Sequence, residues 1–124
     1  MKAEELMIGD WIYLPSIISD DKYPVRVLEI HDDCVRYYCG GKKMLAMYKH
    51  IEPIPLTPGI LEKNGFIRHV YGFSLQHFKL QGNLGEDNIV YFTITVYGKE
   101  IRVDYVHQLQ HALRLCEIEK EIVI

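Results

Sequence analysis

The chain has 124 residues, of which 48% are hydrophobic and 25% are charged, and its formal net charge is −3. This composition excludes an intrinsically disordered chain, and the length suits one domain or two small lobes. No apolar run reaches the roughly 18–20 residues that a membrane-spanning helix needs. The opening MKAEEL also has acidic residues where a signal peptide needs a basic and then an apolar stretch. We therefore expect no membrane contact.

The cysteine count indicates a cellular compartment, whereas the charge distribution does not identify a partner. The three cysteines, Cys34, Cys39 and Cys116, are too few for a disulfide scaffold, and their number is odd. With no signal-peptide pattern, they favour a reducing compartment, and we expect a cytoplasmic protein. Up to residue 52 the chain has nine acidic and seven basic residues, and beyond it eight and seven, so neither part resembles a basic nucleic-acid-binding module.

Short β-favouring runs dominate the first part of the chain. They are rich in aromatic and β-branched residues, and Gly, Asp and Pro separate them. The runs are residues 11–14, 25–31, 34–39 and 44–48. Asp32-Asp33 and Gly40-Gly41 are turn signals between the last three runs, so we predict hairpins within a small curled β-sheet or an SH3-like barrel.

A short linking helix follows. Residues 51–56, IEPIPL, are expected to be extended, because each proline removes an N–H and biases the residue before it toward extended conformations. Thr57 is a good N-cap, Pro58 suits the first helical position, and Gly65 suits the residue beyond the end. These signals predict a helix over residues 58–64.

The pattern then returns to strands. The β-favouring runs are residues 71–80, 89–97 and 100–103, with a polar turn over residues 82–88. Apolar and polar residues alternate through residues 90–96, which is typical of a half-buried strand. We predict an antiparallel three-stranded β-meander.

An amphipathic helix is expected near the C-terminus. Asp104 is a fair N-cap for residues 105–116, where apolar residues recur with helical spacing, and we expect this helix to pack on the meander. The apolar tail, residues 121–124, predicts a last edge strand. The fold class is therefore α+β, with a β-rich lobe over residues 1–55 and a helix, β-meander and helix lobe over residues 56–124. The two lobes either stay separate or form one continuous domain.

Three segments of the chain resemble blocks of a known group of proteins. They are MKAEELMIGDW at residues 1–11, IEPIPLTPGILEKNGF at residues 51–66 and YVHQLQHALRLCEIEKEIVI at residues 105–124. In this order they resemble an uncharacterised family of short proteins encoded by bacterial prophages and other mobile elements. The resemblance implies a cytoplasmic accessory protein and assigns no catalytic residue. Similar proteins often have Glu at the position of Gly59, so a favourable contact with the helix dipole is missing in this chain.

Candidate metal ligands and nucleophiles lack suitable partners. His107 and His111 have the i, i+4 spacing of a helical zinc site, but no third ligand is evident and Arg114 would repel a cation. His31, Cys34, Cys39 and His50 supply nitrogen and sulfur at intervals that do not match zinc knuckles. A Cys–His nucleophilic pair remains an alternative, because a cysteine and a histidine that are distant in the sequence can come together in the fold. We predict no enzyme activity, no cofactor and no metal site.

Two surfaces are candidates for binding. One is a polar, exposed face of the C-terminal helix, made of His107, Gln110, His111 and Arg114. The other interleaves bases with aromatic rings, which can grip phosphates and stack on bases, and it consists of Arg36, Tyr37, Tyr38, Lys42, Lys43 and Lys49. Cross-strand pairing in a half-buried sheet would also explain this second set.

The sequence therefore favours a non-enzymatic protein-binding or adaptor protein of mobile-element origin. We expect its partner to be another protein or a second copy in a homo-oligomer, bound through an exposed sheet edge or the polar helix face. The alternative is a nucleic-acid-binding accessory protein that uses the basic and aromatic region between Arg36 and Lys49.

Overall fold

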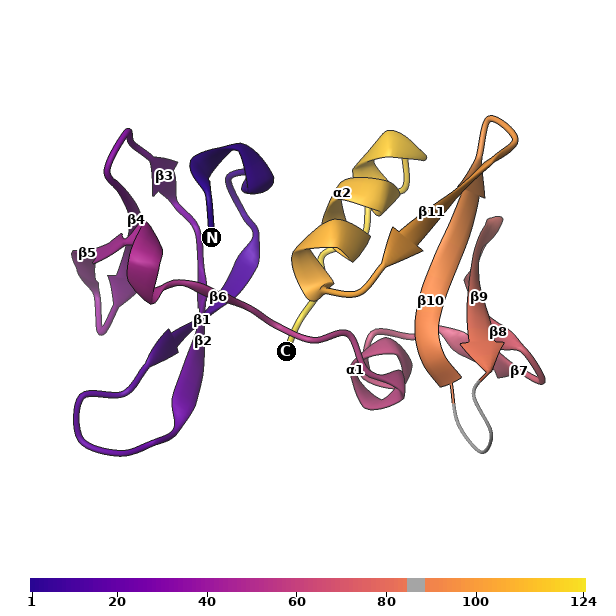
Figure 1. Ribbon diagram of the computed structural model, residues 1–124, viewed down its shortest axis with the longest axis horizontal. Helices are drawn as coiled ribbons and strands as arrows, with labels where there is room; N and C mark the ends of the chain where they lie inside the picture. The colour runs from indigo at the N-terminus through magenta and orange to yellow at the C-terminus, as the bar shows by residue number, and fades with distance from the viewer. Residues whose placement is uncertain (85–88) are drawn as a thin grey trace. The chain divides into compact units, whose positions relative to one another are not determined.

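The computed structural model describes residues 1–84 and 89–124 of the chain. The chain folds into two compact units, Met1–Ile54 (unit 1) and Pro55–Ile124 (unit 2). Antiparallel strands form three open sheets, and a helix lies near the C-terminus (Figure 1). The prediction of an α+β fold rich in β-hairpins is confirmed.

Unit 1 consists of two three-stranded sheets with the strand orders β2-β1-β6 and β3-β4-β5. Its elements are η1 (Ala3–Glu5), β1 (Trp11–Pro15), β2 (Lys22–Arg26), β3 (Glu29–Ile30), β4 (Cys34–Cys39), β5 (Lys42–Met47), η2 (Tyr48–His50) and β6 (Glu52–Pro53). The predicted strand over residues 25–31 is divided between the two sheets. Between its halves, the Val27 N–H donates to the Asp10 carbonyl (2.8 Å) and the Leu28 N–H to the Arg36 carbonyl (2.8 Å). Two open three-stranded sheets therefore take the place of the predicted single curled sheet or SH3-like barrel.

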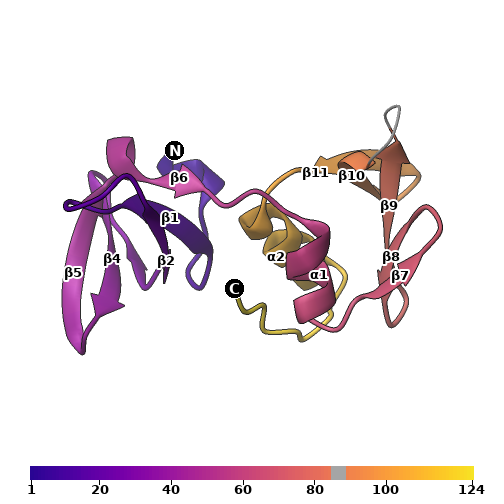
Figure 2. The ribbon, with the colours of Figure 1, turned by 90° about the horizontal axis from the view of Figure 1, so that it is seen from below.

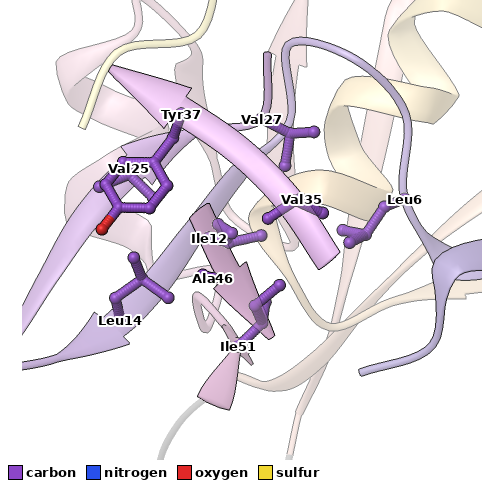
Figure 3. Packing of buried hydrophobic residues seen from close by; sticks show 9 residues of the cluster. All are labelled: Leu6, Ile12, Leu14, Val25, Val27, Val35, Tyr37, Ala46 and Ile51. Atoms are coloured by element: carbon purple, nitrogen blue, oxygen red, sulfur yellow. The ribbon is translucent and has the colours of Figure 1, made fainter. Parts of the chain in front are cut away.

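The core of unit 1 follows from the period-two alternation of its strands. Side chains two residues apart share a face of a strand, and in unit 1 such pairs from three strands point inward together (Figure 3). The buried cluster consists of Leu6, Ile12, Leu14, Val25, Val27, Val35, Tyr37, Ala46 and Ile51. Because the core takes every second residue of β4, the side chains between them face away from it.

Unit 2 begins with the linking helix that the sequence predicted. Its elements are α1 (Pro58–Lys63), β7 (Ile67–His69), β8 (Gly72–Leu75), β9 (Phe78–Leu84), β10 (Ile89–Val96), β11 (Lys99–Val103) and α2 (Val106–Leu115). The Thr57 side chain accepts the Ile60 N–H at 3.2 Å and caps α1. At the other end the Phe66 N–H donates to the Leu61 carbonyl at 3.1 Å, which closes the helix around Gly65.

A five-stranded antiparallel sheet, in the order β11-β10-β9-β8-β7, takes the place of the predicted three-stranded meander. The run over residues 71–80 is two strands, because the chain reverses at Gln76, whose φ is +54°. Residues 82–84, predicted as turn, continue β9, and residues 85–88 of that predicted turn lie outside the described residues.

The helices of unit 2 cover one face of this sheet (Figures 1 and 2). Phe73 is opposite Leu80, and Phe92 is opposite Val103, and all four side chains are buried. The rings of Phe73 and Phe92 meet edge to face with 6.0 Å between centroids. Figures 1 and 2 both show α1 and α2 on the same side of the sheet. Among the described residues of unit 2, no helix lies on the opposite face, which we call the open face.

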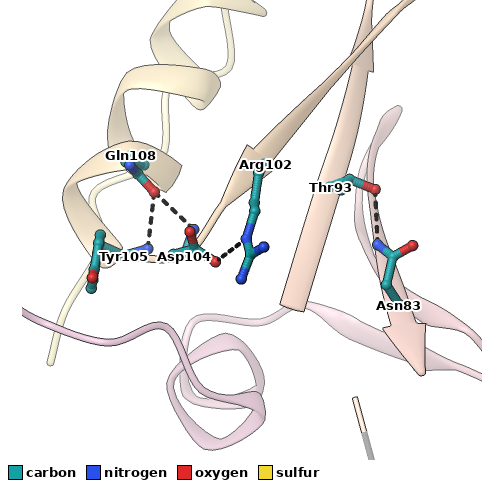
Figure 4. Close-up of polar contacts among 6 residues, drawn as sticks. All are labelled: Asn83, Thr93, Arg102, Asp104, Tyr105 and Gln108. Carbon is teal, nitrogen blue, oxygen red and sulfur yellow. Dashed lines mark hydrogen bonds and ion pairs between the residues drawn. The ribbon is translucent and has the colours of Figure 1, made fainter. Parts of the chain in front are cut away.

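The start of α2 differs by one residue from the prediction. Tyr105, not Asp104, is the N-cap residue. The Gln108 side-chain oxygen accepts the N–H groups of Asp104 (2.8 Å) and Tyr105 (3.2 Å), as Figure 4 shows. The Arg102 guanidinium donates to Asp104 at 2.8 Å, so the carboxylate that was expected to cap the helix pairs with β11 instead.

The C-terminal tail forms no strand, so the predicted edge strand over residues 121–124 is wrong. The buried Asn64 side chain holds the tail instead. Its amide nitrogen donates to the carbonyls of Ile60 (2.8 Å) and Val123 (2.8 Å), and its oxygen accepts the Val123 N–H at 2.7 Å. These bonds satisfy tail backbone groups that a strand would have paired, while Ile118 and Ile122 are buried.

Replacing Asn64 by Ala should lower the free energy of unfolding by about 1–3 kcal/mol, because three hydrogen bonds are lost at a buried site. Urea unfolding measures the change. Lys63→Ala, on the neighbouring exposed residue, is the control and should change stability by less than about 0.5 kcal/mol. Equal stabilities of the two variants would contradict a structural role for Asn64.

Candidate functional site

The β4–β5 hairpin of unit 1 is organised by its turn. Cys39 is opposite Lys42, so the loop between the strands is Gly40-Gly41 alone. Their φ angles are +59° and +79°, and positive φ at both central residues is the signature of a type I′ turn. In such a turn the first carbonyl accepts the N–H of the fourth residue, so Cys39 and Lys42 form a hydrogen-bonded pair.

This pair determines where every other backbone group of β5 points. Hydrogen-bonded and non-bonded pairs alternate along an antiparallel ladder, so Met44 and Ala46 bond to β4, and Lys43, Leu45 and Met47 do not. The N–H and C=O groups of these three residues therefore point away from β4.

Hydrogen bonds on the other side of β4 agree with this assignment. The Leu28 N–H donates to the Arg36 carbonyl (2.8 Å) and the His31 N–H to the Cys34 carbonyl (2.8 Å). Arg36 and Cys34 are the partners of Leu45 and Met47, and their carbonyls face β3. In the described residues no strand pairs with the outer edge of β5.

The side chains of the same residues lie on the outer face of the sheet, opposite the core. Tyr38 and Leu45 are 61% and 53% exposed, and Met47 is also exposed. Arg36 and Lys43 lie among them on this face. The outer face of β4 and β5 thus combines exposed apolar groups with two basic side chains.

Electrostatic pairing compensates part of this positive charge. The Lys43 ammonium lies 2.6 Å from one oxygen of Glu29, and the His31 ring lies 3.0 Å from the other. The hydrogen bond from Lys43, and then that from His31, lowers the pKa of Glu29, and the same carboxylate raises the pKa of Lys43. Lys43 is therefore already paired.

The predicted nucleic-acid surface is not one surface. Arg36, Tyr38 and Lys43 share the outer face, whereas Tyr37 points into the core and is buried, which corrects the prediction for that residue. Lys42 lies on the opposite face beside the turn, and Lys49 lies in η2. The strand alternation that buries Tyr37 separates these side chains.

The predicted exposed face on α2 is also wrong in part. His107 and Gln110 are only 4% and 7% exposed, while Arg114 is exposed and His111 is half-buried. The Tyr105 ring stacks on His107 with 5.9 Å between centroids, and the His111 ring meets it edge-on at 5.7 Å. The two imidazoles belong to a cluster of rings.

The candidate metal ligands and thiols can be placed among the described residues. There, no group of three or more His, Cys, Asp or Glu side chains is arranged to hold a metal ion. Cys34 is buried and Cys39 is exposed, and they lie on opposite faces of β4. Burial, and then the neighbouring Asp33, raises the pKa of the Cys34 thiol, which disfavours the reactive thiolate.

A groove of about 1060 Å³ lies on the open face of the unit 2 sheet, and the sequence analysis missed it. Its described lining residues are Arg68, His69, Val70, Tyr71, Gly72, Phe73, Ser74, His77, Lys79, Leu80, Gln81, Thr93 and Thr95. One row of cross-strand partners crosses all five strands, in the order His69, Gly72, Gln81, Thr93 and Arg102. The register of four strand pairs brings these residues together.

Gly72 lies within this row, where the neighbouring strand comes very close. A Cβ atom on Gly72 would lie 2.2 Å from the backbone oxygen of Leu80, a distance that no side chain can occupy. The Gly82 N–H also donates to the Tyr71 carbonyl at 2.7 Å. Glycine at this position therefore permits the close approach of β8 and β9 under the groove.

Comparison with family models, with curated proteins and with solved structures finds no match to this chain. The resemblance of its three segments to prophage proteins therefore stays a prediction from the sequence. No helix in the described part of the chain is long and apolar enough to cross a membrane.

Burial raises the pKa of Tyr37 to about 12, and the neighbouring Tyr23 hydroxyl adds to the effect. The unfolded state loses this proton near pH 10 and the folded state near pH 12, so stability should fall as the pH rises between these values. The loss should reach at most about 2–3 kcal/mol. Unfolding measured against pH should show this loss in the wild type and in Tyr38→Phe, and much less of it in Tyr37→Phe. Identical pH profiles for both variants would rule the assignment out.

Gly72→Ala and Gly59→Ala should change stability in opposite directions. The first forces backbone apart and should cost about 1–3 kcal/mol. In the second, the new Cβ meets only the Thr57 hydroxyl at 3.8 Å and improves helix propensity, so a gain of about 0.5–1 kcal/mol is expected. Thermal unfolding of both variants tests the pair, and a neutral Gly72→Ala would contradict the close approach.

Proposed function

We propose that this chain is a non-enzymatic adaptor protein that binds another polypeptide by strand addition along β5. The observation that carries the proposal is that the outward backbone groups of Lys43, Leu45 and Met47 coincide with the exposed side chains of the outer face. An incoming strand would find both hydrogen-bonding groups and apolar contacts at one edge.

The partner that fits best is a second copy of the chain. Two β5 strands that pair around a two-fold axis perpendicular to the sheet keep their outer faces on the same side. With Leu45 opposite Leu45, Lys43 is opposite Met47, and every residue with outward backbone groups pairs with another such residue. A shift by one residue would place outward groups opposite inward ones, and a shift by two would leave a residue at each end without a partner.

The charges also suit this register. Neither lysine of β5 faces a lysine of the other copy, because Met47 takes the place opposite Lys43. Cross-strand partners extend the central row in each copy from Leu45 through Arg36 to Glu29. The row therefore reads acid, base, Leu, Leu, base, acid across six strands, and each Arg36 is opposite a Glu29 of its own copy.

The resemblance to prophage and mobile-element proteins supports a setting in the bacterial cytoplasm. An adaptor that pairs with itself can join two copies of whatever each chain binds. This part of the proposal rests on the sequence alone.

Substitutions on two neighbouring residues of β5 test the proposal. Leu45→Pro removes an outward N–H and leaves the bonds between β4 and β5 intact, so it should abolish dimers while the folded monomer persists. Leu45→Lys should weaken the dimer strongly because two lysines meet at the centre, whereas Met44→Lys, on the other face of the strand, is the matched control. Sedimentation equilibrium over a range of concentrations gives the dissociation constant, with circular dichroism to check the fold.

Hydrogen exchange of single amides provides a readout that does not depend on any variant. The amides of Lys43, Leu45 and Met47 should exchange fast in dilute solution and become protected as concentration rises, while those of Met44 and Ala46 stay protected throughout. A monomer at all concentrations, with the three outward amides always unprotected, would overturn self-pairing. Protection of the same amides only on adding a host protein would replace the second copy by that protein.

A further inference from the structure

The groove on the open face of the unit 2 sheet is a second binding surface, independent of β5. We infer that it binds single-stranded nucleic acid. It has about 1060 Å³, just above the usual size range of ligand pockets, and most of its lining residues lie on the open face, where the described part of unit 2 has no helix (Figure 2).

The charge of the groove has one sign. Arg68, His69, His77 and Lys79 line it, and none of its described lining residues is Asp or Glu. Lys79 has no ion-pair partner among the described residues. The Arg68 guanidinium turns toward the helix-covered side instead, because it lies 5.4 Å from the centre of the Phe73 ring and 3.2 Å from Glu62 of α1. The chain as a whole has a net charge of −3, so the attraction for a polyanion has to be local.

Rings and hydrogen-bonding groups accompany these charges. Tyr71 is 65% exposed and lines the groove, and the exposed imidazoles of His69 and His77 offer further flat faces. Ser74, bonded to the His69 ring at 2.6 Å, Gln81 and Thr95 present polar groups between them. Aromatic faces stack on bases of any sequence while cations hold the backbone, which is how single strands are bound without strong sequence preference.

Two residues of the row that runs from His69 to Arg102 are held in place by contacts with other side chains of unit 2. Thr93 is buried in this row, and its hydroxyl accepts a hydrogen bond from the Asn83 amide at 3.2 Å (Figure 4). On the far side of the row, the Arg102 guanidinium lies 4.2 Å from the centre of the Tyr91 ring and pairs with Asp104. These residues already have partners, as Arg68 has in Glu62 and the Phe73 ring, so we assign contact with the ligand to Tyr71 and Lys79.

A single strand fits these contacts better than the other anionic ligands. In a duplex the base faces are stacked inside, out of reach of Tyr71. An acidic peptide would meet the cations but would not, by its charge alone, use the exposed rings. The exposed ring of Tyr71, and a lysine with no ion-pair partner in the described part of the chain, therefore favour a ligand with phosphates and free bases.

Fluorescence anisotropy with labelled ten-nucleotide oligo(dT) and oligo(U) tests the inference on the full chain. Tyr71→Ala should weaken binding about tenfold or more, since a base stacked on an aromatic ring contributes on this scale. Lys79→Gln should reduce the slope of log K against log salt concentration by about 0.7, the contribution of one phosphate contact on a single strand.

Matched controls lie on the same sheet outside the groove. Lys99→Gln removes the same charge from β11, and Tyr97→Ala removes an exposed ring from the turn before it. Both should leave the affinity and the salt slope unchanged. Equal effects of Lys79→Gln and Lys99→Gln, or no saturable binding at low salt, would overturn the inference.

Competition identifies the ligand class. An unlabelled duplex of equal length should compete at least tenfold less well than the single strand, and equal competition would overturn the single-strand assignment. Full displacement by inorganic phosphate or a nucleoside monophosphate at the same phosphate concentration would reduce the site to a phosphate or nucleotide pocket. Since the edge of β5 plays no part here, Leu45→Pro should bind the oligonucleotide with an unchanged constant per site when the chain is dilute.

Discussion

The two-residue turn at Gly40-Gly41 is the constraint on which the features of unit 1 depend. Positive φ at both residues makes Cys39 and Lys42 a hydrogen-bonded pair, and strand alternation then decides the orientation of every residue in β4 and β5. One consequence is the core, because Tyr37 and Ala46 point inward. The other is the open edge, where Lys43 and Leu45 direct their backbone groups outward. Inserting one residue in this turn would change the pairing, so the core and the edge are consequences of one local conformation.

In unit 2 the corresponding constraint is the close approach of β8 and β9 at Gly72. The backbone of Leu80 occupies the space that a side chain at position 72 would need. The row from His69 to Arg102 therefore has no side chain at Gly72. The helices α1 and α2 cover the other face, where Phe73 and Phe92 pack. A sheet covered on one side needs polar residues on the other, and the groove residues meet this need while remaining available to a ligand. The groove has Lys79 and no Asp or Glu among its described lining residues, which goes beyond what solvation requires.

The parts of the fold that local rules determine could be predicted from the sequence, and those that distant contacts determine could not. The helix Pro58–Lys63 has its cap, its proline and its terminal glycine next to each other, and the prediction is right to within one residue. The tail was predicted wrongly because Asn64, 59 positions before Val123, supplies its hydrogen bonds. The reversal at Gln76 has no glycine to signal its positive φ. Most of the groove escaped notice because its residues come from four strands, and only the register of the sheet brings them together.

The two proposals, taken together, account for an acidic protein with a cationic groove. A chain with a net charge of −3 repels a polyanion at long range, so a single groove with few cations would bind a strand with low affinity. Pairing through β5 would give each assembly two grooves by symmetry. When one groove holds a strand, the second meets the same strand at a raised local concentration, provided that the strand is long enough to reach both. Avidity would then raise the affinity that the few cations of one groove leave low. Binding would depend on both protein concentration and strand length. In such a protein, control over self-pairing would also be control over binding.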